Sequence, residues 1–289
     1  MSNHERSMAH AHVRVTNLDF VSTRFERPRA TDAHATRLVV VTMSDSPGEW
    51  YAKLPPVSKF WLTSCALTTA GWHAGVTDPR MLALSWKLVR GKFQPWRLVT
   101  NFVFLGKLSL GFAMRMYMIA QYAVSLERSA FTGANGTADF MTFLLTGAAV
   151  LTPLELVAPT FAQAFYADSL IFMCLYLWSR ENPRARVSLM GVVRVGAFYF
   201  PWAMLGMTVI MGGDPVPDLL GILAGHFYHF FVNIYPRRSG RRSFIQTPRF
   251  LIALADYVNS GTGTLNAASN AVRPPATRYF QGTGRRLDD

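Results

Sequence analysis

Apolar runs long enough to cross a lipid bilayer recur along this chain and constrain its fold more than any other feature. The hydrocarbon core of a bilayer is about 30 Å thick and needs roughly 20 apolar residues of helix. Within it, backbone polar groups must be bonded inside the protein. We therefore predict an all-α membrane protein with six transmembrane helices. The predicted spans cover residues 59–77, 108–126, 140–158, 161–178, 189–211 and 219–235.

Composition and loop charge agree with this prediction. Charged residues are 16% of the 289, below the roughly 25% of a soluble domain. A net charge of +12 could indicate that the protein binds nucleic acid. We expect none, because the basic residues lie mostly between and beyond the apolar runs, where positive-inside topology puts them. Arg180 and Arg184 precede the fifth span and Asp214 follows it, which favours both termini in the cytosol.

The two ends of the chain are polar. Residues 1–42 hold no apolar run as long as the roughly 7–15 residues of a signal-peptide core, so we predict a disordered extension. A mis-chosen start codon or a targeting role stays open for it. Residues 236–289 are basic and rich in Pro, Gly and Ser, and we predict a disordered cytosolic tail. Cys65 and Cys174 lie inside apolar runs without metal-ligand spacing, so neither a metal nor a cofactor is expected.

Residues 78–106 alternate apolar and basic side chains and hold no clean span. We predict an amphipathic loop lying in the membrane interface. Trp96 suits the headgroup layer, and Arg97 can bond either loop carbonyls or lipid phosphate. We expect this pair to anchor the loop. The positive charge of the loop does not fit the predicted lumenal side, so it needs a local role such as anchoring at lipid phosphates.

The segment FQPWRLVTNFVF, which contains this pair, resembles the Trp-Arg motif of the derlin and rhomboid superfamily. Further segments continue the derlin pattern over about residues 43–255. The resemblance implies a six-span rhomboid-like helical bundle at 43–235, in the endoplasmic reticulum membrane and without catalysis. These segments are SLERSAF, GTADFMTFLL, YLWSRENP, FYFPWAMLGMTVIMGG, DLLGILAGHFYHFF and FIQTPRFL.

A second resemblance lies near the end of the chain. The segment FQGTGRRL at 280–287 is similar to the box F-x-G-x-G-x-x-L with which derlins recruit the valosin-containing AAA ATPase. Phe280 and Leu287 would be its apolar anchors, and Gly282 and Gly284 would let the chain lie close to a groove. The flexible flanks suit a peptide that folds on binding.

The sixth predicted span raises the question of catalysis, because His226 follows Gly221-x-x-x-Gly225. Rhomboid proteases need a serine in a G-x-S-G turn on the fourth span, and no glycine flanks Ser169 here. They also place His and Asn on the second span, where this chain reads KLSLGFAMRMYMIAQ. Losing one oxyanion donor costs about 2.7–4 kcal/mol. We therefore predict that the chain is not an enzyme, and that His226 is either a packed, hydrogen-bonded residue or a groove-lining one.

Two further features of the predicted spans concern packing and polarity. Gly221 and Gly225 lie one turn apart and let another backbone come close, within one subunit rather than between copies. Arg115 replaces a neutral residue expected from the family. It is a candidate lining for a hydrophilic groove, or a partner of Glu155 or Asp168.

The resemblance implies a role in endoplasmic-reticulum-associated degradation, where misfolded proteins pass to the cytosol and the ATPase extracts them. Its partners would be the ATPase, a membrane ubiquitin-ligase complex, misfolded substrates and the bilayer, with homo- or hetero-oligomers left open. Short spans would thin the bilayer. Alternatives are derlin-like import of plastid preproteins and an intramembrane serine protease using Ser169. No inverted-repeat signal favours a transporter.

Overall fold

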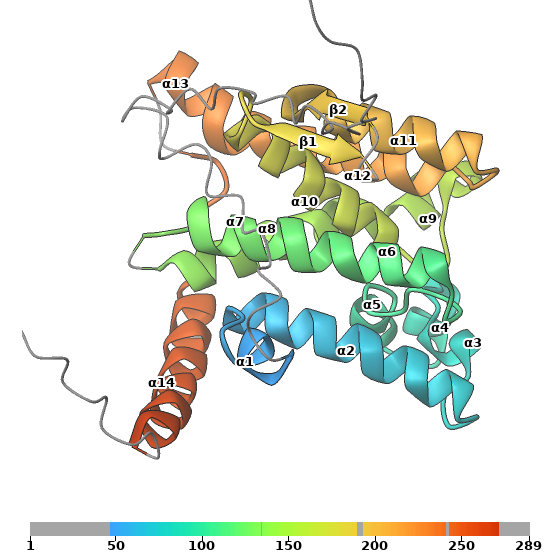
Figure 1. Cartoon of the computed structure of the whole chain (residues 1–289). Coiled ribbons are helices and arrows are strands. Elements are labelled where there is room, and N and C mark those ends of the chain that lie inside the picture. The colour runs from blue at the N-terminus through green and yellow to red at the C-terminus, as the bar shows by residue number, and fades with distance from the viewer. Residues whose placement is uncertain (1–46, 134, 190–192, 241–242, 272–289) are drawn as a thin grey trace, which may run out of the picture.

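In the computed structural model, the described residues are 47–271 except for 134, 190–192 and 241–242. They form a bundle of helices that run side by side, with a small hairpin and one helix, α14, lying across the ends of others (Figure 1). The extension 1–42 and the box at 280–287 lie outside the described residues.

Six helical segments occupy the positions of the predicted spans, each with shifted ends. Two of them contain a π-helical turn, and the fifth begins with a 3-10 turn. The segments are α2 (Pro56–His73); α6 (Leu110–Met118), η1 (Ile119–Ala123) and α7 (Val124–Ser129); α8 (Gly136–Leu151) and α9 (Leu154–Val157); α10 (Ala167–Glu181); η3 (Ala197–Tyr199) and α11 (Phe200–Ile210); and α12 (Val216–His229), η4 (Phe230–Ile234) and α13 (Tyr235–Ser239).

By length and composition alone, one helix in the described part of the chain is long and apolar enough to cross a bilayer. It covers Gly136–Val157, with 22 residues and a mean hydropathy of 1.7. The segment Ala197–Ile210 is apolar but shorter. The predominantly helical class is confirmed, and the number of spans stays a prediction.

Short helices lie before the first predicted span and in the loop between the first two predicted spans. None exceeds six residues, which suits a loop folded on the bundle rather than a further span. They are α1 (Pro47–Ala52), α3 (Pro79–Leu82), α4 (Trp86–Gly91) and α5 (Arg97–Thr100), and a 3-10 turn, η2 (Pro159–Phe161), precedes α10.

A β-hairpin lies where the start of the fifth span was predicted, so the all-α prediction is wrong for this segment. Strand β1 (Arg186–Leu189) pairs antiparallel with β2 (Val193–Gly196), with Arg186 opposite Gly196. The sequence RVSL…VRV alternates polar and apolar residues, a period of two that favours a strand over a helix. The helix of the fifth segment therefore begins at Ala197 instead of 189.

The prediction of disorder from residue 236 onward is also wrong for much of the tail. Helix α13 continues to Ser239, and α14 (Arg249–Ala271) adds 23 residues. Leu251 and Ala255, one turn apart, are buried against Ala138 of α8. This small apolar contact explains why a segment of tail-like composition folds as a helix.

Helix α10 lies at the centre of the bundle, with most of its side chains buried. It packs against α12 at two glycines. A Cβ atom at Gly221 would lie 2.2 Å from the carbonyl oxygen of Ser169, and one at Gly225 would lie 2.9 Å from Cδ1 of Tyr176. Both glycines therefore permit a close helix contact within the subunit.

We expect Gly221→Ala to destabilise the bundle by about 1–3 kcal/mol or more, because the backbones of α10 and α12 must separate to admit the methyl group. Gly206→Ala on α11 is the matched control, since its Cβ would meet nothing within 4 Å. It should be neutral or stabilising by up to about 1 kcal/mol through helix propensity. Thermal unfolding in detergent micelles measures both. Equal melting temperatures for the two variants would contradict this account of the contact.

Candidate functional site

A cavity of about 620 Å³ lies between α6, α10, α11 and α12. Phe200, the first residue of α11, and Met211, which directly follows its last residue, both line the cavity, and Ser188 of β1 adds a contact from the hairpin. The cavity therefore extends along most of the length of α11. Its apolar wall is rich in flexible methionines, which adapt to varied shapes. These are Met114, Met118, Met204, Met207 and Met211.

An ion pair joins two walls of the cavity. Nε of Arg115 on α6 lies 2.6 Å from Oδ1 of Asp168, in the first turn of α10. The contact is a close approach of opposite charges rather than a linear hydrogen bond. Both side chains are partly exposed, at 38% and 29%, so each stays accessible to whatever enters the cavity.

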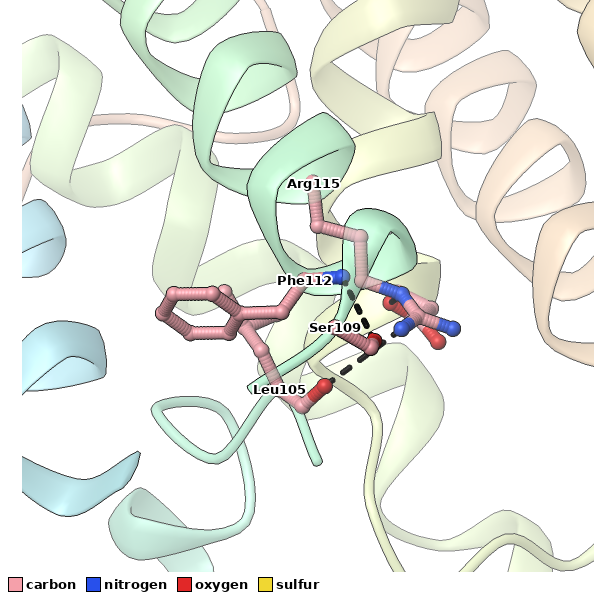
Figure 2. A network of polar contacts seen from close by, with 5 residues as sticks. Leu105, Ser109, Phe112 and Arg115 are labelled. Atoms are coloured by element: carbon pink, nitrogen blue, oxygen red, sulfur yellow. Dashed lines mark hydrogen bonds and ion pairs between the residues drawn. The ribbon is translucent and has the colours of Figure 1, made fainter. Parts of the chain in front are cut away.

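The start of α6 holds Arg115 in place. Nη1 of Arg115 reaches back 3.4 Å to the carbonyl oxygen of Leu105, and the backbone N–H of Phe112 donates to Oγ of Ser109 at 3.3 Å (Figure 2). Ser109 is thus the N-cap of α6. Arg115, predicted to line a groove, lies in the cavity wall.

Glu155, the other partner that the sequence offered for Arg115, has a different role. Its Oε2 accepts a hydrogen bond from the backbone N–H of Trp86 at 3.0 Å. The indole of Trp86 donates to the carbonyl oxygen of Thr152 at 2.6 Å. Glu155 therefore ties α4 to the end of the third helical segment.

Asp218 is a cavity residue that the sequence analysis did not single out. It lies in the first turn of α12 and is 4% exposed, and its Oδ2 has no hydrogen-bond partner among the described residues. With Asp168 and Asp214 it gives the described part of the lining three acids against one base, Arg115. The signal in the sequence was its position just after Pro217, at the first turn of an apolar helix.

His226 lies outside the lining of this cavity. Its Nδ1 is 2.8 Å from the hydroxyl oxygen of Tyr176 on α10. Ser169 is fully buried, and its Oγ has no hydrogen-bond partner in the described part of the chain. Ser169 and Tyr176 are two turns apart on α10, about 10 Å. The histidine is therefore hydrogen-bonded away from the serine that a protease would need it to activate.

Arg97 holds the loop between the first two helical segments together from inside. Its side chain is 6% exposed. Nη1 donates to the carbonyl oxygens of Arg80 and Ala83, each at 2.7 Å, and Nε donates to Oε1 of Gln94 at 2.7 Å. The sequence left loop carbonyls and lipid phosphate open as acceptors for Arg97, and the structure shows bonds to loop carbonyls. Trp96, its neighbour, is 51% exposed on the loop surface.

Glu127 has a structural role that the sequence analysis missed. Its carboxylate accepts hydrogen bonds from the backbone N–H groups of Val57 at 3.0 Å and Ser58 at 2.8 Å, and from Oγ of Ser58 at 2.6 Å. These N–H groups belong to the first turn of α2, which has no bonding partners within its own helix. Glu127 is thus an N-terminal cap supplied from α7, and no local pattern in the sequence indicates it.

Comparison with known proteins decides the family. A family model described as the Der1-like family matches residues 54–249. The chain belongs to the Der1-like family. Derlin-1 of Arabidopsis thaliana is 45% identical over 206 residues, which cover 71% of this chain and 76% of that protein. Derlin-1.1 of Zea mays is 40% identical over 248 residues, covering 84% and 99%. The resemblance found in the sequence is confirmed.

Membership in the derlin family carries its general character over to this chain. Derlins are rhomboid-like pseudoproteases that are generally non-catalytic and reside in the endoplasmic reticulum membrane as multi-pass proteins. The pairing of His226 with Tyr176 agrees with that character. The cavity with its ion pair is thus a candidate binding surface rather than a reaction centre.

We expect Arg97→Ala to loosen the loop by about 2–3 kcal/mol, because three charge-assisted hydrogen bonds are lost and two carbonyl acceptors lose their donor. Limited digestion with chymotrypsin at the exposed Phe93 and Trp96 should become faster. Arg90→Ala is the control, since the Arg90 guanidinium lies only over the Trp86 ring, at 5.5 Å. Equal digestion rates in the two variants would show that Arg97 does not hold the loop.

The ion pair is tested by charge reversal. Arg115→Asp should lower stability on the order of 1 kcal/mol, a modest value because both groups are partly exposed. Adding Asp168→Arg should restore the melting temperature. Adding Glu155→Arg to Arg115→Asp is the matched control and should give no rescue. Rescue by position 155 rather than 168 would contradict the pairing seen here.

Proposed function

We propose that this derlin acts without catalysis in endoplasmic-reticulum-associated degradation, helping misfolded proteins return to the cytosol. In this proposal it offers a polar path through a thinned bilayer and recruits a valosin-containing-protein-type AAA ATPase to extract the substrate. A membrane ubiquitin-ligase complex would act with it. The placement in the derlin family supports the degradation role.

The cavity is the observation that carries the proposed path. An unfolded chain crossing hydrocarbon exposes backbone N–H and C=O groups, each costing several kcal/mol when unsatisfied. Asp168 presents an acceptor for N–H groups, and Arg115 presents donors for carbonyls, while the more deeply buried Asp218 adds an acid to the same lining. The methionines beside them accommodate side chains of many shapes. Such a lining suits substrates that share a backbone but no sequence.

Two short helices support the proposed thinning of the bilayer. Helix α2 has 18 residues, about 27 Å at 1.5 Å per residue. Helix α10 has 15 residues, about 22 Å on the same geometry. Both are shorter than a hydrocarbon core of about 30 Å, and a bilayer thins around a short helix at a modest cost per ångström. The thinner layer shortens the path of a crossing chain.

In the proposed topology both termini lie in the cytosol. The arginines of the hairpin segment and of the tail stand on that side, and the acidic turn before α12 stands on the lumenal side. Helices α12 and α13 then deliver the tail to the cytosol. This is the side on which an ATPase would have to act.

We expect Phe280→Ala with Leu287→Ala to abolish co-purification of the ATPase with the full-length chain, because both apolar anchors of the box are removed. Clearance of a misfolded substrate should slow in the same cells. Gln281→Ala with Thr283→Ala, at the variable positions of the same box, is the matched control and should leave both readouts unchanged. Normal ATPase recovery and clearance in the first variant would refute the role assigned to the box.

A further inference from the structure

Helix α14 has an orientation unlike the spans. It lies across the ends of neighbouring helices instead of running along them (Figure 1), beside α8 and α2. A hydrogen bond from Oγ1 of Thr247 to Asp139 holds its start against the first turn of α8. These contacts place α14 at the boundary where the first turns of α2 and α8 meet solvent or headgroups.

The side chains of residues 249–260, the first half of α14, divide into three arcs at 100° per residue. Leu251 and Ala255, 4% and 3% exposed, face the bundle. Phe250, Leu254 and Tyr257 follow one another at spacings of four and three and form a second apolar stripe, which lies beside the packed face. They are 66%, 47% and 77% exposed.

The third arc of α14 is polar. Arg249, Asp256 and Ser260 are exposed and lie away from both apolar arcs. A helix with one face on the bundle, one apolar flank and one charged flank fits the boundary between lipid and water. If the helix lay in open solvent, Phe250, Leu254 and Tyr257 would be exposed to water without any apolar surface to contact.

We propose that α14 lies in the headgroup layer of the cytosolic leaflet, with Phe250, Leu254 and Tyr257 inserted among the acyl chains and Arg249 on lipid phosphates. The neighbouring α2 presents Phe60 and Leu67 outward at 70% and 67% exposure. Exposed apolar side chains on a neighbouring helix suit contact with lipid.

Charge complementarity supports the same occupant. The chain between α12 and α14 carries a cluster of arginines, and a cytoplasmic leaflet is anionic. Each basic residue near such a surface contributes on the order of 1 kcal/mol. An apolar stripe preceded in the sequence by these charges matches anionic lipid. The cluster comprises Arg237, Arg238, Arg241, Arg242 and Arg249.

The placement has a consequence for the tail. Helix α14 ends at Ala271, and the box begins at Phe280. Nine residues span at most about 30 Å when fully extended. An in-plane α14 would therefore keep any partner of the box close to the membrane surface.

The test uses the full-length chain in lipid nanodiscs, labelled with an environment-sensitive fluorophore at one introduced cysteine. Leu254→Cys reports the stripe, and Asp256→Cys, two residues away on the polar arc, is the matched control. The native Cys65 and Cys174 are 0% and 1% exposed, and the unsubstituted chain gives the background. We expect blue-shifted emission and several-fold stronger quenching by headgroup-proximal nitroxide lipids at position 254 than at 256.

Lipid composition tests the charge component. Moving from phosphatidylcholine discs to discs with phosphatidylserine should increase quenching at 254, and Arg249→Gln should reduce that gain. Equal emission and quenching at 254 and 256 would overturn the proposal. A shift at 254 seen only after adding the purified ATPase, or lost when each disc holds one chain, would also overturn it, since the stripe would then be a protein contact.

Discussion

The contact between α10 and α12 is the constraint on which the rest of the bundle depends. Helix α10 is buried from Ser169 to Ser179, and the second, third, fifth and sixth helical segments all pack against it. Gly221 meets the carbonyl oxygen of Ser169, and Gly225 meets the ring of Tyr176. Helices in a bilayer gain little from burying apolar side chains, because lipid is equally apolar, and they associate through close packing instead. Two glycines on one face provide that packing.

Two buried charged residues, Glu127 and Arg97, each bond backbone groups that would otherwise lack a partner. Glu127 bonds the free N–H groups at the start of α2, and Arg97 bonds carbonyls of the loop before the second helical segment. Both sites join segments distant in sequence. A buried charge is stable only where it is bonded in this way. Arg115 and Asp168 differ, because they pair with each other while partly exposed in a cavity.

The pattern of the sequence was enough to predict the helical class, the approximate positions of the six helical segments in residues 56–239 and the closeness of Gly221 to a neighbour. It was not enough to predict α14, because only Leu251 and Ala255 bury there and the tail composition hides so small a contact. The hairpin was not predicted, because its valines can belong to an apolar helix as readily as to a strand. The roles of Asp218 and Glu127 could not be predicted, because they depend on residues that are distant in the sequence and close only in the fold.

The close packing that builds this bundle also separates it from protease chemistry. Ser169 is buried where Gly221 approaches the carbonyl oxygen of Ser169. A substrate therefore has no route to the Ser169 hydroxyl on that face. His226, five residues beyond Gly221 on α12, is held by Tyr176. Asp168, the adjacent residue on α10, points to another side of the helix and lines the cavity. One helix turn thus buries the hydroxyl of Ser169 and places the carboxylate of Asp168 in the cavity wall.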